Sequence, residues 1–267
     1  MKLFDTHCHL TDSPLKDDLD GVLTRAAEAG VTAFLVPGYD LVSSRQACRL
    51  AASRPEIHAA IGLHPAWLER GESFSPEPFR QLARLRQPVA IGEIGLDYAL
   101  DGFSPETQER ALRAQLELAG ILNLPVLLHC RRAFEPLYLI LRDYPGVVGV
   151  LHAYGGGPRL MERFLKLGYH LGFGGGLTRP NAKKVRVCAV EVPRERILLE
   201  TDAPYIGTHL VPKGATEPRE TAAVATALAE VRGWTLAETA RLTTANACRF
   251  LSLKESGVPE ERSGKTE

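Results

Sequence analysis

The sequence predicts a single α/β domain folded as a (β/α)8 TIM barrel, and three observations lead to that fold class. Eight short runs are apolar throughout rather than alternating, as parallel strands covered on both faces require. The first run starts at Lys2 and the last at Ile197, so one step averages about 28 residues, enough for a strand, a helix and two loops. The segments between the runs carry helix signals. A doubly wound open sheet is the lesser alternative.

The eight predicted strands follow one another along most of the chain. They cover residues 2–7, 31–37, 57–63, 89–93, 126–129, 147–152, 169–174 and 197–201. Two of the expected helices are marked clearly. Phe134, Leu137, Tyr138 and Leu141 share one helical face, and Thr235 with Glu238 forms a capping box that opens a last helix running toward Leu251.

Composition is that of a packed globular protein. Of the 267 residues 45% are hydrophobic and 24% charged, which excludes a disordered or collagen-like chain. Gly and Pro are spread along the chain without a linker, so we expect one barrel domain over residues 1–253 and a polar, disordered tail over residues 254–267.

Charge and cysteine content limit the partners and the compartment. Thirty-two basic residues balance thirty-two acidic ones, so any contact with nucleic acid must come from a local patch. The five cysteines are widely spaced and form no C-x-x-C pair, which argues against disulfides and zinc ribbons. No run resembles a signal peptide or a membrane span. We therefore expect a cytoplasmic protein without membrane association, and nothing indicates an obligate protein partner.

Metal-capable side chains stand at the ends of five predicted strands, where barrel enzymes place their chemistry. They are His7, His9, Glu93, His129, His152 and Asp202. In the His7-Cys8-His9 segment the two imidazoles project to the same face, because side chains alternate along an extended chain. Each element alone is commonly a buried core residue or a helix cap. Their joint placement on one rim predicts a metal site instead.

Four imidazoles and two carboxylates are too many for one open catalytic ion, so the set predicts two divalent ions that share a carboxylate. Such ions lower the pKa of a bound water to about 7, so that hydroxide, the attacking nucleophile, forms at neutral pH. Asp202 is the expected proton acceptor, and Glu93 the other expected catalytic carboxylate. Mixed imidazole and carboxylate ligands suit Zn, Mn, Fe or Ni.

The motifs FDTHCHL, GLHP, IGEIGLDY, LHCRRA, LHAYGGG, LGFGG and LLETDAPY resemble, in this order, those of the TatD family of metal-dependent hydrolases, within the amidohydrolase-like barrel superfamily. The resemblance runs from about Phe4 to Asn246. It implies His7, His9 and Asp202 on one ion, His129 and His152 on the other, and Glu93 between them in the place of the carbamylated lysine found elsewhere in the superfamily. Family precedent also admits Mg.

The sequence departs from the family pattern in two substrate-facing loops. The segment His152-Ala153-Tyr154-Gly155-Gly156 stands where His-Cys-Phe-Ser-Gly is common, and Thr216 precedes Glu217-Pro218 where many members have Asn. These differences bear on the substrate more than on the metal.

Further residues near the predicted strand ends are candidates for substrate contact. His64 and Arg131 could orient a phosphate or hold an oxyanion, and Tyr154 or Tyr98 could stack on a base. The glycine-rich run at residues 172–176, with Thr178 and the basic side chains of Lys183, Lys184 and Arg186, could bind phosphate after strand seven.

Three functions are compatible with these residues. The resemblance favours a TatD-type deoxyribonuclease that hydrolyses phosphodiesters from the 3′ end of DNA. A small-molecule hydrolase acting on an amide, lactone or ester, including a small phosphoester, is the alternative, because fold and metals do not fix the substrate. A non-catalytic metal-binding barrel is the third. A basic rim would favour the nuclease, and an enclosed apolar pocket the small-molecule enzyme.

Overall fold

The computed structural model describes residues 1–68, 74–102 and 104–253. Eight parallel strands lie side by side in sequence order and form the barrel that the sequence predicts. They are β1 (Leu3–Asp5), β2 (Val31–Pro37), β3 (Ile57–Ile61), β4 (Ala90–Asp97), β5 (Val126–Arg131), β6 (Gly149–Leu151), β7 (His170–Phe173) and β8 (Ile197–Leu199). The predicted tail at residues 254–267 lies outside the described residues.

Backbone hydrogen bonds join the last strand to the first. The Thr6 N–H donates to the Leu199 carbonyl at 2.9 Å, and beyond the strand ends the Asp202 N–H donates to the His7 carbonyl at 2.7 Å. A parallel bridge between Cys8 and Ala203 continues this contact. The segments that carry the first two histidines and the last aspartate are thus fixed against each other.

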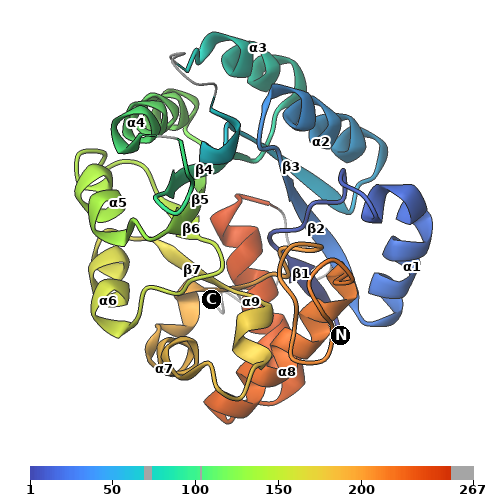
Figure 1. Cartoon of the computed structure of the whole chain (residues 1–267). Coiled ribbons are helices and arrows are strands. Elements are labelled where there is room, and N and C mark those ends of the chain that lie inside the picture. The colour runs from blue at the N-terminus through green and yellow to red at the C-terminus, as the bar shows by residue number, and fades with distance from the viewer. Residues whose placement is uncertain (69–73, 103, 254–267) are drawn as a thin grey trace, which may run out of the picture.

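Helices surround the strands, as Figure 1 shows. They are α1 (Leu19–Glu28), α2 (Leu41–Ser53), α3 (Glu77–Arg86), α4 (Pro105–Leu122), α5 (Phe134–Leu141), α6 (Pro158–Lys166), α7 (Lys183–Glu191), α8 (Thr221–Arg232) and α9 (Leu236–Phe250). The two helices singled out from the sequence are present. Thr235 caps α9 by accepting the Glu238 N–H at 3.1 Å. No described helix is long and apolar enough to cross a bilayer.

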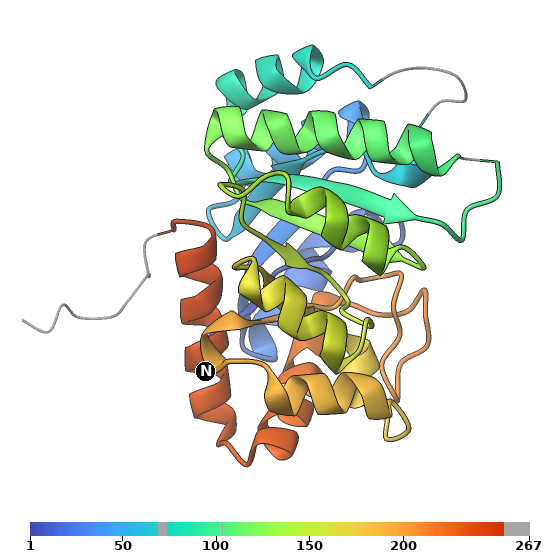
Figure 2. The same cartoon turned by 90° about the vertical axis from the view of Figure 1, so that its left-hand side faces the viewer.

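Helix α9 lies across the end of the barrel from which the strands start (Figure 2). Its buried residues pack on side chains that point into the barrel. This inner cluster contains Phe4, Leu35, Ala60, Ala90, Leu127, Val150 and Leu198 from the strands and Ala247, Cys248, Phe250 and Leu251 from the last helix and its end. The inside of the barrel is thus apolar at this end, and the candidate ligands lie at the opposite end.

The observed strand ends differ from the predicted ones by a few residues. Strands β4 and β5 extend to Asp97 and Arg131, whereas β1, β6 and β8 stop short of the polar residues that follow them. Glu93 and His129 therefore lie within strands, and the other predicted ligands lie just beyond strand ends. The register pairs Gly95 with His129, and a Cβ at Gly95 would lie 2.0 Å from the His129 carbonyl oxygen. Glycine is required here for the two strands to approach.

Candidate metal centre

The structure brings together all six residues that the sequence nominates as ligands. His7, His9, Glu93, His152 and Asp202 are at most 9% exposed, and His129 is half-buried. They come from the ends or interiors of β1, β4, β5, β6 and β8. Burying four imidazoles and two carboxylates in one place is costly unless they pair or bind a cation.

Glu93 lies at the centre of the cluster and divides it into two groups. Its Oε2 faces the first strand, 3.4 Å from His7 Nε2 and 3.9 Å from His9 Nε2. Its Oε1 faces the other side, 3.1 Å from His129 Nδ1 and 2.9 Å from His152 Nε2. One carboxylate thus presents a different oxygen to each pair of histidines.

Asp202 completes the first group. Its Oδ1 lies 3.1 Å from His9 Nε2 and 3.6 Å from His7 Nε2. The residue has a positive φ of 54°, a left-handed conformation that aspartate tolerates better than most residues. Immediately after β8 the chain therefore turns so that this carboxylate faces the histidines.

Mutual charge interactions shift the pKa values of the cluster. Burial opposes the charge on Glu93, but the imidazoles of His152, His64 and His7 hold its pKa well below the ordinary value. Burial likewise disfavours the charged form of His152, yet the carboxylates of Glu93 and Glu200 together raise its pKa well above the ordinary value. Burial also opposes the charge on Asp202, but the hydrogen bond with His9 and the charges of the neighbouring histidines together lower its pKa. The carboxylates of Glu93 and Asp202 are therefore ionised at neutral pH.

Several imidazole nitrogens in this cluster are buried without a hydrogen-bond partner in the described part of the chain, as expected for atoms that bind a cation. Neither nitrogen of His7 has a hydrogen-bond partner among the described residues, although both are buried, and Nδ1 of His9 and of His152 also lack one. His7 Nε2 points between the two carboxylates at distances too long for a hydrogen bond. A divalent ion between these atoms would satisfy the nitrogen and offset both negative charges.

Three further carboxylates support the cluster, and the sequence argument missed them. Asp5 accepts hydrogen bonds from Thr201 Oγ1 at 2.6 Å and from the Thr201 N–H at 3.0 Å, which joins the end of β1 to the end of β8. Burial raises the Asp5 pKa to about 7. Asp97 Oδ2 lies 3.2 Å from His129 Nε2, and Glu200 Oε1 lies 3.6 Å from His152 Nδ1. Such partners orient a ligating imidazole.

Two of the predicted substrate contacts lie beside the cluster. His64 Nε2 is 3.7 Å from Glu93 Oε1, within reach of the same ion as His129. Burial lowers the His64 pKa to about 4, and its Nδ1 accepts the Ala66 N–H at 3.0 Å. The Arg131 side chain is 61% exposed and lies 3.8 Å from Asp97 Oδ2.

The two tyrosines predicted to stack on a base are placed elsewhere. Tyr154 is 2% exposed, packs edge-on against Phe134 and donates its hydroxyl to the Gly157 carbonyl at 2.8 Å. The Tyr98 hydroxyl donates to Glu109 at 2.7 Å. Neither residue lines the cavity at the cluster. Tyr154 is buried and borders a different cavity, next to the glycine-rich run, so its contact with a base remains a prediction.

A cavity of 220 Å³ opens directly over the cluster. Its walls are formed by His9, Tyr39, His64, Trp67, Glu93, His129, His152, Asp202 and Tyr205. The sequence argument missed the three aromatic residues, although each follows a strand end by two to six residues. Position after a strand end is the same criterion that nominated the candidate ligands.

A neighbouring cavity of 330 Å³ shares Tyr205 with the first and includes the predicted glycine-rich loop. Its cationic side chains are Arg179 and Lys213, rather than the nominated Lys183, Lys184 and Arg186. Thr178 is occupied within the protein, because its hydroxyl donates to Gly175 O and accepts the His209 N–H, both at 2.7 Å. A phosphate there would meet Arg179 and Lys213.

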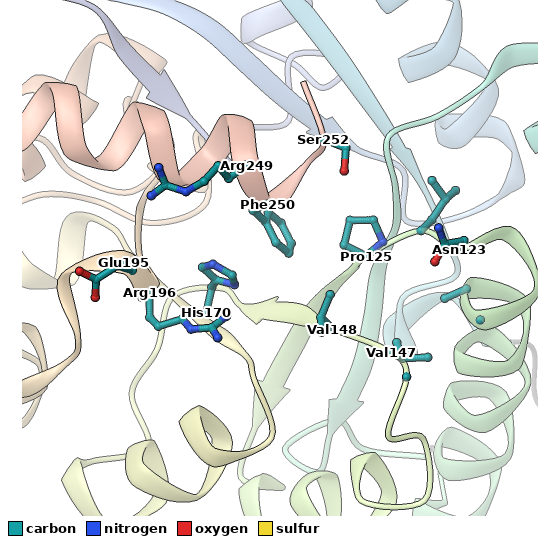
Figure 3. Close-up of a pocket in the computed structure, with 14 residues that line it drawn as sticks. Asn123, Pro125, Val147, Val148, His170, Glu195, Arg196, Arg249, Phe250 and Ser252 are labelled. Carbon is teal, nitrogen blue, oxygen red and sulfur yellow. The ribbon is translucent and has the colours of Figure 1, made fainter. Parts of the chain in front are cut away.

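A third cavity, of 440 Å³, lies at the opposite end of the barrel (Figure 3). His170 and Phe250 form one wall, with ring centroids 5.0 Å apart, and Pro125 and Val148 lie across from them. Burial and the nearby Arg196 lower the His170 pKa to about 4. This cavity is separate from the metal-capable cluster.

Comparisons with known proteins agree with this geometry. The family model described as TatD related DNase matches residues 4–252. The chain is 37% identical over 268 residues to the 3'-5' ssDNA/RNA exonuclease TatD of Klebsiella pneumoniae (strain 342), covering 96% of this chain and 100% of that protein. It is 38% identical over 235 residues to the metal-dependent hydrolase YjjV of Escherichia coli (strain K12), covering 86% and 90%. The crystal structure of the TatD homologue YjjV of Escherichia coli K12 superposes with a TM-score of 0.89 at 35% identity, covering 94% and 98%.

Proposed function

The chain belongs to the TatD family of metal-dependent hydrolases, and from this premise we propose that it is a 3′–5′ exonuclease acting on single-stranded nucleic acid, DNA above all. The observation that carries the proposal is the division of the histidines by Glu93, which presents Oε2 to one pair and Oε1 to the other. That arrangement supports two divalent ions, the number used to clamp a scissile phosphate.

In this proposal His7, His9 and Asp202 would hold one ion, His129 and His152 would hold the other, and Glu93 would serve both. Ions held there would polarise a phosphoryl oxygen and generate the attacking hydroxide at neutral pH. His64 and Arg131 stand where they could orient the phosphate. Asp202 lines the cavity and is the candidate to take the proton from the attacking water and pass it to the leaving oxygen.

The walls of the cavity over the cluster are better suited to the end of a nucleic-acid strand than to a small apolar substrate. Trp67 is 47% and Tyr205 44% exposed at the mouth, and Arg131 stands beside it with a largely exposed side chain. The mouth is thus open, and the cations of the adjoining cavity extend the surface available to a phosphate backbone. The small-molecule alternative would be favoured by an enclosed apolar pocket, and this cavity is not enclosed, because Trp67 and Tyr205 are partly exposed at its mouth.

The first test is release of nucleotides from end-labelled single-stranded DNA. Metal-stripped protein is reconstituted in turn with Mg, Mn and Zn, and wild type is compared with Asp202→Asn, Glu93→Gln and the exposed control Asp17→Asn. We expect metal-dependent release from the 3′ end, a loss of at least 100-fold in Asp202→Asn and Glu93→Gln, and wild-type rates in the control.

Metal content measured on the same samples separates the two roles. Glu93→Gln is expected to lower the bound metal from two equivalents per chain, whereas Asp202→Asn should lose more activity than metal. Release that survives in Asp202→Asn near the wild-type rate would remove it as proton acceptor. If two ions bind but no nucleic acid is cleaved while a small ester or amide is, the small-molecule hydrolase replaces the nuclease.

A further inference from the structure

Three aromatic side chains line the cavity over the metal-capable cluster. We call Tyr39, Trp67 and Tyr205 the aromatic wall. The rings of Tyr39 and Trp67 are in contact, with centroids 4.7 Å apart. The rings of Tyr205 and His9 pack edge to face, with centroids 5.0 Å apart. They follow β2, β3 and β8 respectively.

One carboxylate holds the two tyrosines of this wall. Asp12 accepts the Tyr39 hydroxyl at Oδ1, at 2.9 Å, and the Tyr205 hydroxyl at Oδ2, at 2.7 Å. Both hydroxyls are therefore engaged within the protein. What the tyrosines leave to a ligand in the cavity is the surface of their rings.

Trp67 stands on a short 3-10 turn, Pro65–Trp67, that begins directly after His64. The turn is fixed at its start, because His64 Nδ1 accepts the Ala66 N–H at 3.0 Å and the His64 carbonyl accepts the Trp67 N–H at 2.9 Å. Through this turn the indole is held close to the cluster, 6.4 Å from the His64 ring.

The aromatic wall leaves much of its surface open. A single exposed aromatic residue needs no explanation, but here Trp67 is 47% and Tyr205 44% exposed while both border the same cavity. The interior of that cavity is polar and charged, so its floor and its mouth differ in chemistry. Such a site matches a ligand with a planar apolar part joined to an anionic part.

We propose that the aromatic wall, and Trp67 above all, binds the 3′-terminal nucleobase by stacking while the neighbouring phosphate lies over the cluster. The inference rests on the proposed function and names the part of the substrate that this site grips. Stacking on an aromatic ring is available to every base, so cleavage is tolerant of sequence. A base paired and stacked within a duplex cannot present its face in this way, which makes an unpaired 3′ end the substrate.

Tryptophan fluorescence provides a test that needs no turnover. The chain has two tryptophans, and the second, Trp234, lies against Arg232 and Arg194 after α8, away from this cavity. In the metal-loaded Trp234→Phe protein the emission comes from Trp67. We expect it to be quenched by a short oligothymidylate whose last linkage is a cleavage-resistant phosphorothioate, and to be unaffected when the 3′-terminal nucleotide lacks its base.

Kinetics give the second readout. Trp67→Ala is expected to raise KM for single-stranded DNA about tenfold, with kcat within about threefold of wild type, and Trp67→Phe should restore most of the affinity. The preference for a normal 3′ end over an abasic one should disappear in Trp67→Ala, as expected when two changes remove one shared interaction. Trp234→Phe is the matched control and should behave as wild type.

The outcomes separate this inference from the function it rests on. Equal quenching by normal and abasic oligonucleotides, or an unchanged KM in Trp67→Ala, would overturn the stacking role even if the protein cleaves DNA. Base-dependent quenching without cleavage under any metal would support the aromatic wall as a base site and count against the nuclease instead.

Discussion

At the scale of single residues, the metal-capable cluster is organised by carboxylate oxygens that point in different directions. Glu93 serves two pairs of histidines because its two oxygens diverge. His129 and His152 each have a carboxylate behind the ring, Asp97 in one case and Glu200 in the other. A Cβ at Gly172 would lie 2.2 Å from Glu200 Oε2, so the adjacent strand leaves room for that carboxylate. The positions of these candidate ligands are thus set by the carboxylates behind their rings as well as by their contacts with each other.

Tyr154 gives a prediction at this scale. Tyr154→Phe removes the hydrogen bond to the Gly157 carbonyl without changing the packing on Phe134. We expect the free energy of unfolding, measured by urea titration, to fall by about 1 kcal/mol, with KM and kcat on single-stranded DNA unchanged. A rise in KM at unchanged stability would instead place this residue among the substrate contacts.

At the scale of elements, the two ends of the barrel have different roles. The starts of the strands pack on α9, whose Asn246 donates to the Arg194 carbonyl at 2.8 Å and to the Ile197 carbonyl at 2.9 Å. The opposite ends of the strands carry the polar cluster. Helix α9 thereby anchors the beginning of β8, and Asp202 reaches the cluster three residues beyond the end of that short strand.

The contact between β7 and α9 predicts a pH dependence of stability. His170 packs on Phe250, and burial together with Arg196 lowers its pKa to about 4. The unfolded chain, with an ordinary value near 6.5, takes up a proton as the pH falls, whereas the folded protein does not until about pH 4. The free energy of unfolding therefore falls between pH 6.5 and 4.

We expect His170→Gln to reduce that fall. Urea unfolding of both metal-free proteins at several pH values between 7.5 and 4.5 measures it, and the difference between the two curves isolates this side chain from other titrating groups. Parallel curves over the whole range would show that His170 takes up its proton equally in both states.

At the scale of the whole molecule, the candidate ligands tie together distant parts of the chain. The six residues come from β1, β4, β5, β6 and β8 or the turns that follow them, and the last of them is 195 residues from the first. A cation held among them would cross-link almost the whole barrel. It would also offset the charge of buried carboxylates that otherwise oppose folding.

Metal removal should therefore lower thermal stability. An ion at about 100 times its Kd adds about 2.7 kcal/mol, which for a chain of this size corresponds to roughly 5–10 °C in Tm. Calorimetry with and without chelator measures the shift, which should reverse on adding metal and shrink in Glu93→Gln. Identical melting with and without chelator would argue against a buried ion.

The sequence by itself determined the barrel and the set of candidate ligands. Apolar runs at a regular spacing require parallel strands covered on both faces, and polar residues at the ends of such strands must converge on one rim, so His7 and Asp202 could be joined across 195 residues. The predicted helices followed from local signals, such as the cap at Thr235.

The tertiary structure alone decided which other side chains share that rim and which face they present. Tyr154 and Tyr205 both follow strand ends, yet the first is enclosed by packing and the second borders the cavity. The division of the histidines between the oxygens of Glu93 likewise depends on the rotation of one side chain. Strand periodicity places a residue at a barrel end, but whether its side chain meets solvent, protein or substrate depends on neighbours contributed by distant segments.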